Sequence, residues 1–151
     1  MDLGIANKTA LICASSKGLG RGCAEALAEA GVHLVINARG QDALQAAADS
    51  IRGRFNVRVE TVAADITTLE GQNSVLKVLE TPDILINNAG GPPPGMWTDW
   101  EKEDFLAALE ANMLTPIAMI KRILPSMIEK GWGRVVNITS QSVKAPIAVL
   151  G

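Results

Sequence analysis

The chain has 151 residues, of which 48% are hydrophobic and 20% are charged, and its formal net charge is −2. This length and composition indicate one globular domain and exclude a disordered chain or a basic nucleic-acid-binding protein. There is no run of membrane-spanning length, no basic signal region and only one histidine, His33, so we expect a cytoplasmic protein with no membrane partner and no metal.

Apolar runs alternate with helical patterns along the whole chain. We expect five strands, over residues 8–14, 32–37, 57–63, 84–87 and 134–139. Helices are expected from the end of the glycine turn at 14–20 to Gly31, and over 41–51, 68–79 and 101–130. This βαβ alternation predicts parallel strands joined by crossover helices, which is an α/β fold.

The helical patterns also predict which side chains face the core and where the last helix is interrupted. Pro116 predicts a break or kink near residues 112–115, and Pro125 predicts a second bend. Three prolines exclude a helix in the loop from 91 to 100. The stripes expected to point inward are Leu19, Cys23, Leu27 and Ala30; Leu69, Val75, Leu76 and Leu79; and Ile117, Ile120, Leu124 and Ile128. Because they fall on apolar positions, we expect Cys13 and Cys23 to be buried, reduced thiols.

The stretch from Ala10 to Gly31 is a strand, a small-residue turn and a helix. Glycines in such a turn let the backbone approach a ligand closely, and the following helix amino terminus favours an anion. The pattern predicts a site for a dinucleotide pyrophosphate. The spacing is not the full G-x-G-x-x-G, because Cys23 stands at the third glycine position.

Two cations accompany this turn. Lys17 precedes Gly18, and Arg39 follows the second strand, where an NAD site would place an acid for the ribose 2′-hydroxyl. Each alone would be an ordinary solvated charge, but together they favour NADP(H) over NAD(H). The sequence Asn87-Asn88-Ala89-Gly90 ends the fourth strand. It is either a plain strand-ending turn or backbone placed beside a cofactor.

In this order, the motifs resemble those of short-chain dehydrogenases/reductases, in particular the 3-oxoacyl-carrier-protein reductase branch. The family's T-G-x-x-x-G-x-G corresponds to residues 13–20, with Cys13-Ala14 in place of Thr-Gly. Its acidic residue after the third strand corresponds to Asp65, and its N-N-A-G to residues 87–90. The resemblance implies a doubly wound, Rossmann-like parallel sheet of strand order 3-2-1-4-5 and a NAD(P)-binding domain over residues 1–151.

The resemblance also assigns roles to individual residues. Ser140 would polarise a substrate carbonyl and Asn112 would anchor a water of the proton relay. Ser142 is a second choice for the serine, and Lys144 is read as a solvated charge. Asn112 could equally be a kink residue that satisfies backbone groups near Pro116. The cofactor-binding residues are expected to be Ala14, Ser15, Ser16, Lys17, Gly18, Leu19, Gly20, Arg39, Asp65, Ile66, Asn88, Ala89 and Gly90.

The resemblance implies an NADP(H)-dependent oxidoreductase that reduces a ketone or 3-oxoacyl group to an alcohol. The family's proton donor, the tyrosine of Tyr-x-x-x-Lys, has no counterpart, because the chain contains no tyrosine. We therefore expect a domain that is incomplete at its C-terminus, truncated before the last family strands, and inactive by itself. The helical region 101–130 is expected to mediate a homo-oligomer. The alternative is a non-catalytic nucleotide-binding or scaffold protein that retains the cofactor half.

Overall fold

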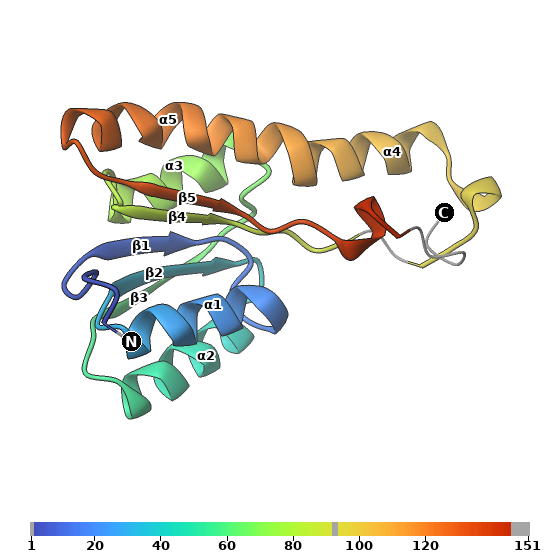
Figure 1. The fold of residues 1–151 in the computed structure, drawn as a ribbon. Coiled ribbons are helices and arrows are strands. Elements are labelled where there is room, and N and C mark those ends of the chain that lie inside the picture. Colours follow the sequence, from blue (N-terminus) through green and yellow to red (C-terminus); the bar gives the residue numbers. More distant parts are fainter. Residues whose placement is uncertain (1, 92–93, 146–151) are drawn as a thin grey trace.

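The computed structural model describes residues 2–91 and 94–145, and it contains one five-stranded parallel sheet. The strand order is β3-β2-β1-β4-β5, as the sequence predicted. All arrows in Figure 1 point the same way, so the carboxyl ends of the strands share one edge. The strands are β1 (Thr9–Ile12), β2 (His33–Ala38), β3 (Val59–Ala63), β4 (Ile84–Asn87) and β5 (Arg134–Asn137).

Helices cover both faces of this sheet (Figure 1). On one face lie α1 (Gly18–Glu29) and α2 (Gln41–Arg54), and on the other lie α3 (Leu69–Val78) and α5 (Thr115–Glu129). Before α5 come a single 3-10 turn (Trp97–Asp99), α4 (Lys102–Leu109) and a π-helical segment (Glu110–Leu114). Each expected element is present; the bounds of β4 are as predicted, and those of the other elements differ from the predicted ones by at most three residues.

The alternation of side chains along β1 explains why this strand is an unbroken apolar run. Ala10 and Ile12 pack in the cluster with α1 and α2, whereas Leu11 and Cys13 pack in the cluster with α3 and α5. A parallel strand covered by helices on both faces must be apolar at every position. The middle strand β1 is therefore buried, and only its ends are available for chemistry.

In α1 and in α3, one residue each that was predicted to face the core is exposed instead. Leu19 and Leu69, at the first turns of α1 and α3, are each 68% exposed. The buried stripe of α1 consists instead of small residues, Gly20, Ala24 and Ala28. Small side chains let this helix approach the sheet closely, and the larger Leu19 is left outside.

The inward stripe of α5 was predicted incorrectly at three of its four positions, and only Ile120 packs against the core. Thr115, Met119, Ile123 and Met127 are buried, while Ile117, Leu124 and Ile128 are 44%, 40% and 70% exposed. The helix carries apolar residues on two faces, so periodicity alone does not identify the one that packs on the sheet. The outer face continues onto α4 and the π segment. Its exposed apolar residues, which we call the outer apolar face, are Phe105, Leu106, Leu109, Met113, Leu114, Ile117, Leu124 and Ile128.

The expected break near residues 112–115 is a π-helical segment rather than an end of the helix. The backbone N–H of Thr115 donates to the carbonyl of Glu110, and α5 then continues through Pro125 to Glu129. The side-chain amide of Asn112 donates to the carbonyl of Ala108 at 3.0 Å. Because α5 continues past Pro125 to Glu129, this proline does not interrupt the helix.

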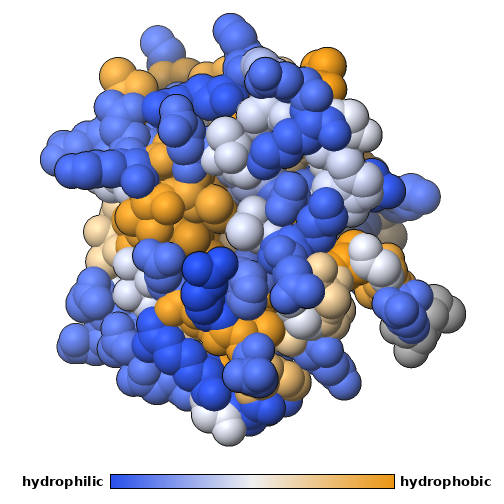
Figure 2. All heavy atoms as spheres, turned by 90° about the vertical axis from the view of Figure 1, so that its left-hand side faces the viewer, coloured by the Kyte–Doolittle hydropathy of each residue, from blue (hydrophilic) through white to orange (hydrophobic). Residues whose placement is uncertain are grey.

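No helix in the described part of the chain is long and apolar enough to cross a membrane. Figure 2 faces the amino ends of the strands, where apolar patches lie among polar and charged side chains.

Candidate functional site

The turn between β1 and α1 lies at the carboxyl edge of the sheet and has unusual backbone geometry. Ala14 has φ 47° and Gly18 has φ 57°, so both adopt the left-handed region. Among the described residues, Lys17 at the N-cap makes no side-chain hydrogen bond to the first turn of α1. Uncapped N–H groups together with the helix dipole suit an anionic ligand.

Asn88, directly after β4, holds this turn against the sheet. Its Nδ2 donates to the carbonyl oxygens of Ala14 at 3.1 Å and of Cys13 at 3.4 Å. Gly20 lies in the same contact, because a Cβ there would stand 2.4 Å from the Ala14 oxygen and 2.8 Å from Asn88 Nδ2. Only glycine fits at this position, so the start of α1 is held close to both strands.

The predicted residues beyond β2 and β3 lie at the same edge of the sheet. Arg39 is exposed, one residue after β2, and Asp65 is half-buried, two residues after β3. Hydrogen bonds from the hydroxyl (2.7 Å) and N–H (3.0 Å) of Thr67, with a smaller contribution from the Arg39 charge, lower the pKa of Asp65. An ionised carboxylate and a guanidinium therefore lie near each other at this edge.

Ser15 differs from the exposed residues of the turn. It is fully buried, and its hydroxyl donates to the carbonyls of Ile12 at 2.9 Å and Asn37 at 3.2 Å. Its side chain and its backbone N–H, which donates to the Asn37 carbonyl at 2.8 Å, are thus both engaged within the protein. Asn37 was not predicted to take part in the site, although an asparagine at the end of an apolar strand is a signal that the sequence does contain.

The cysteines are free, and Cys13 is buried. Burial raises the pKa of the Cys13 thiol to about 12. Because a thiol with this pKa stays protonated at neutral pH, Cys13 is not a nucleophile. Cys23 is half-buried, so the expectation of a buried thiol holds fully for Cys13 only.

A cavity of about 240 Å³ lies where β4, β5 and the π segment meet. Asn88, Ala89, Asn112 and Thr139 are among its lining residues, so the structure brings the asparagine of the helix and the N-N-A-G turn together. Asn87 Nδ2 also donates to Asn137 Oδ1 at 2.9 Å, which joins β4 to β5 at the cavity wall. This concave, partly polar space is suited to a small organic molecule.

Ser140 follows directly after the cavity residue Thr139 and is exposed. Its hydroxyl donates to the hydroxyl of Ser142 at 3.0 Å and accepts from the Ser142 N–H at 3.1 Å. The two candidate serines therefore contact each other. Lys144, also exposed, directly follows the short 3-10 turn (Gln141–Val143).

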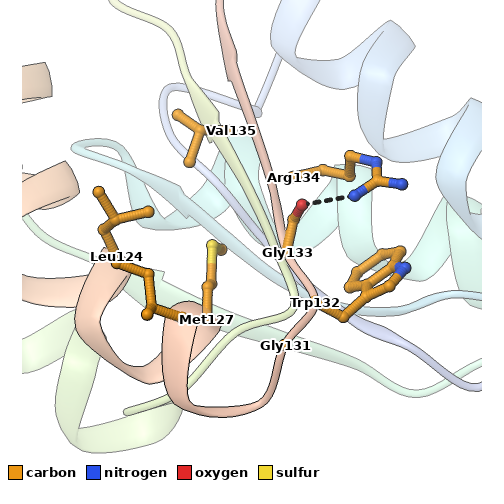
Figure 3. Close-up of a pocket in the computed structure, with 8 residues that line it drawn as sticks. Leu124, Met127, Gly131, Trp132, Gly133, Arg134 and Val135 are labelled. Carbon is orange, nitrogen blue, oxygen red and sulfur yellow. Dashed lines mark hydrogen bonds between the residues drawn. The ribbon is translucent and has the colours of Figure 1, made fainter.

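A larger cavity, of about 470 Å³, lies at the opposite end of the sheet, where α5 ends and β5 begins. Figure 3 shows Leu124, Met127 and Val135 on one side of β5, and the side chains of Trp132 and Arg134 on the other side of this strand. Among the described residues of its wall, Arg134 is the only titratable one, and its guanidinium stacks on Trp132 at 4.7 Å. Since these described residues include no acid, base or nucleophile, the smaller cavity is the candidate site.

Comparison with known proteins gives a consistent assignment. A family model described as short chain dehydrogenase matches residues 8–151. An uncharacterized oxidoreductase of Bacillus subtilis is 33% identical over 147 residues, which cover 97% of this chain and 56% of that protein. The 3-oxoacyl-[acyl-carrier-protein] reductase of Aquifex aeolicus is 28% identical over 144 residues, covering 93% of this chain and 58% of the relative.

The crystal structure of L-sorbose reductase from Gluconobacter frateurii, complexed with NADPH and L-sorbose, has a TM-score of 0.93 to this chain at 32% identity. The alignment covers 99% of this chain and 59% of the reductase. The chain thus spans between half and two thirds of the length of each of these relatives.

Proposed function

Because the chain belongs to the short chain dehydrogenase family, we propose that it is the cofactor-binding part of an NADP(H)-dependent oxidoreductase. The reaction is the reduction of a ketone or 3-oxoacyl group to an alcohol. The observation that carries this proposal is the convergence of the uncapped start of α1, Arg39 and Asp65 at one edge of the sheet, beside the cavity of Asn112.

The turn residues 14–20 and the first N–H groups of α1 would hold the pyrophosphate. Lys17 and Arg39, both exposed cations, would pair with the ribose 2′-phosphate, since charge-assisted bonds to phosphate are strong. Asp65 and Ile66 would lie along the adenine, and Asn88, Ala89 and Gly90 along the nicotinamide ribose. The bound nicotinamide supplies or accepts the hydride.

The substrate would occupy the cavity at the carboxyl ends of β4 and β5. The Ser140 hydroxyl, now turned to Ser142, would donate to the substrate oxygen, where negative charge develops as the carbonyl is reduced. Asn112 would hold a water on the path of the proton. A proton donor must complete this set, and the chain contains no tyrosine. We therefore propose that these 151 residues bind the cofactor without appreciable turnover.

The test is to titrate the purified chain with NADPH and then to measure NADPH oxidation with a 3-oxoacyl thioester and a simple ketone. Saturable binding without oxidation is expected. Oxidation by the chain alone would contradict the assignment of a missing proton donor. Absence of NADPH binding would contradict the cofactor site itself.

A nucleotide-binding or scaffold protein without turnover is the second candidate. It is favoured by Ala14, which stands where the family has glycine and yet adopts the left-handed conformation. The reading frame beyond codon 151 separates the two candidates. A Tyr-x-x-x-Lys there supports the enzyme, and other residues support the binding module. For either one, we propose a cytoplasmic location and a homo-oligomer formed through residues 101–130.

A further inference from the structure

The buried amide of Asn37 joins the ends of two strands. Asn37 is the penultimate residue of β2 and is 1% exposed. Its Nδ2 donates to the carbonyl of Val62 at 2.9 Å and to that of Ala64 at 3.0 Å. Both amide protons are thereby used, one on the penultimate residue of β3 and one just beyond its end. Asparagine is unfavourable inside strands, so its presence here calls for a specific role.

The same residue is also bonded to the glycine turn through Ser15. The Asn37 N–H donates to the Ser15 hydroxyl at 3.1 Å, and the Asn37 carbonyl accepts from the Ser15 N–H at 2.8 Å. The Ser15 hydroxyl, which is fully buried, donates to Ile12 and Asn37 carbonyls. Together the two residues form a closed polar contact where β1, β2 and β3 end.

Each of the three segments joined by these hydrogen bonds leads into a part of the candidate cofactor site. Ser15 lies in the turn 14–20, Arg39 is two residues after Asn37, and Asp65 directly follows Ala64. We propose that Asn37 and Ser15 are positioning residues that set the spacing of the turn, Arg39 and Asp65. They would thereby determine the affinity for the adenosine 2′-phosphate half of a dinucleotide. This inference deepens the proposed function and rests on it.

The position of β3 makes this spacing depend on Asn37. In the described sheet β3 is an edge strand with β2 as its one neighbour. An isosteric Asn37→Asp change replaces the donating amide with an oxygen that faces the Val62 and Ala64 carbonyls. The resulting repulsion would separate the end of β3 from β2 and move Asp65 relative to Arg39. The milder Ser15→Ala change would loosen only the link between the turn and β2.

Adenosine 2′,5′-bisphosphate and NADPH serve as the two probes for the experiment. Asn37→Asp is expected to weaken the binding of both by the same factor, at least tenfold, and Ser15→Ala is expected to weaken both less. Thr9→Val is the matched control. It removes a hydroxyl that donates to Asp83 at 3.0 Å at the opposite end of the sheet, so it lowers the melting temperature but leaves both affinities within twofold.

Amide hydrogen exchange of the ligand-free chains is the second readout, and it does not require cofactor binding. Asn37→Asp should raise exchange in the turn 14–20 and at Asp65, while the ends of β4 and β5 stay protected. Wild-type affinity in a destabilised Asn37→Asp chain, or exchange confined to residue 37 itself, would overturn the positioning role. If the wild-type chain binds neither probe, the proposed function fails, and the exchange pattern alone then decides whether Asn37 couples the three segments.

Discussion

Asn88 and Ala14 are joined by a hydrogen bond of 3.1 Å from the side-chain amide of one to the backbone carbonyl of the other. This bond links the end of β4 to the turn that begins α1. It runs past Gly20, where a Cβ would stand 2.8 Å from the same amide nitrogen. The site is thus assembled by the close approach of backbone segments as much as by side chains that could touch a ligand.

The Gly20→Ala change tests this close approach. The new Cβ would meet the Ala14 oxygen at 2.4 Å, so we expect a loss of about 1–3 kcal/mol in the free energy of unfolding and weaker NADPH binding. Gly22→Ala on the same helix is the control, because nothing lies within 4 Å of its Cβ. That change should stabilise the chain by about 1 kcal/mol. Urea unfolding measures the free energy of unfolding of both variants. The same change in both would contradict the close contact at Gly20.

Ala14→Gly should stabilise the chain. Ala14 has φ 47°, and the left-handed conformation costs a non-glycine residue roughly 1–2 kcal/mol. Glycine loses more conformational entropy on folding than alanine does, which offsets part of this energy. The net gain in the free energy of unfolding is about 0.5–1 kcal/mol. Ala26→Gly, at an exposed position of α1, should instead lose about 1 kcal/mol. A loss of stability in Ala14→Gly by the same urea measurement would contradict this interpretation.

The lowered pKa of Asp83 predicts how the free energy of unfolding depends on pH. Burial alone raises its pKa, but hydrogen bonds from the Thr9 N–H and hydroxyl, with the charges of Lys130 and Lys8, lower it overall. A carboxyl group with a lower pKa in the folded state binds more protons when unfolded. Its contribution is therefore present above the ordinary aspartate pKa of about 3.9 and is lost as the pH falls through the folded value.

The corresponding measurement compares the melting temperatures of the wild type and Asp83→Asn from pH 7 to pH 3. The wild type should melt higher at pH 7, and the gap should close as the pH falls. A gap that is constant across this range would show that the Asp83 charge does not contribute to stability.

The outer apolar face predicts self-association. Phe105 and Leu109, on α4, are 56% and 47% exposed, and contiguous apolar surface of this kind marks interaction sites. We expect sedimentation to detect a homo-oligomer of the wild type and a monomer of the Phe105→Glu/Leu109→Glu double variant. Lys121→Glu, an exposed change on α5, should keep the oligomer. A monomeric wild type, or an oligomeric double variant, would contradict the prediction.

Hydrophobic periodicity and the turn residues between the apolar runs were sufficient to predict the position of each element and the parallel sheet, whereas the strand order came from the family resemblance. Each βαβ unit has few packing solutions, and the strands are short runs bounded by glycine, proline or asparagine. The faces of the helices were harder to predict. In α5 both Ile123 and Leu124 belong to apolar stripes, and only the three-dimensional packing shows that Ile123 is buried.

Residues of the candidate site that belong to a sequence motif could be named from the sequence. Residues that take part through side-chain contacts between distant segments could not. The motifs identified Asn88, Asp65 and Arg39, which the structure places at one edge of the sheet. Asn37 was missed because its partners are backbone carbonyls, 25 and 27 residues away. No spacing rule in a single sequence encodes such a contact.

We propose that the carboxyl edge of β1, β2 and β3 binds NADP(H) through its 2′-phosphate. Calorimetric titration of NADPH and NADH into the wild type, Arg39→Asp and the control Arg58→Asp tests it most directly. The loss of a charge-assisted contact of about 1.5–3 kcal/mol predicts that Arg39→Asp weakens NADPH binding on the order of 10- to 100-fold. NADH affinity should stay the same or improve, and Arg58→Asp should behave as wild type. Equal NADPH affinity before and after Arg39→Asp would contradict the account.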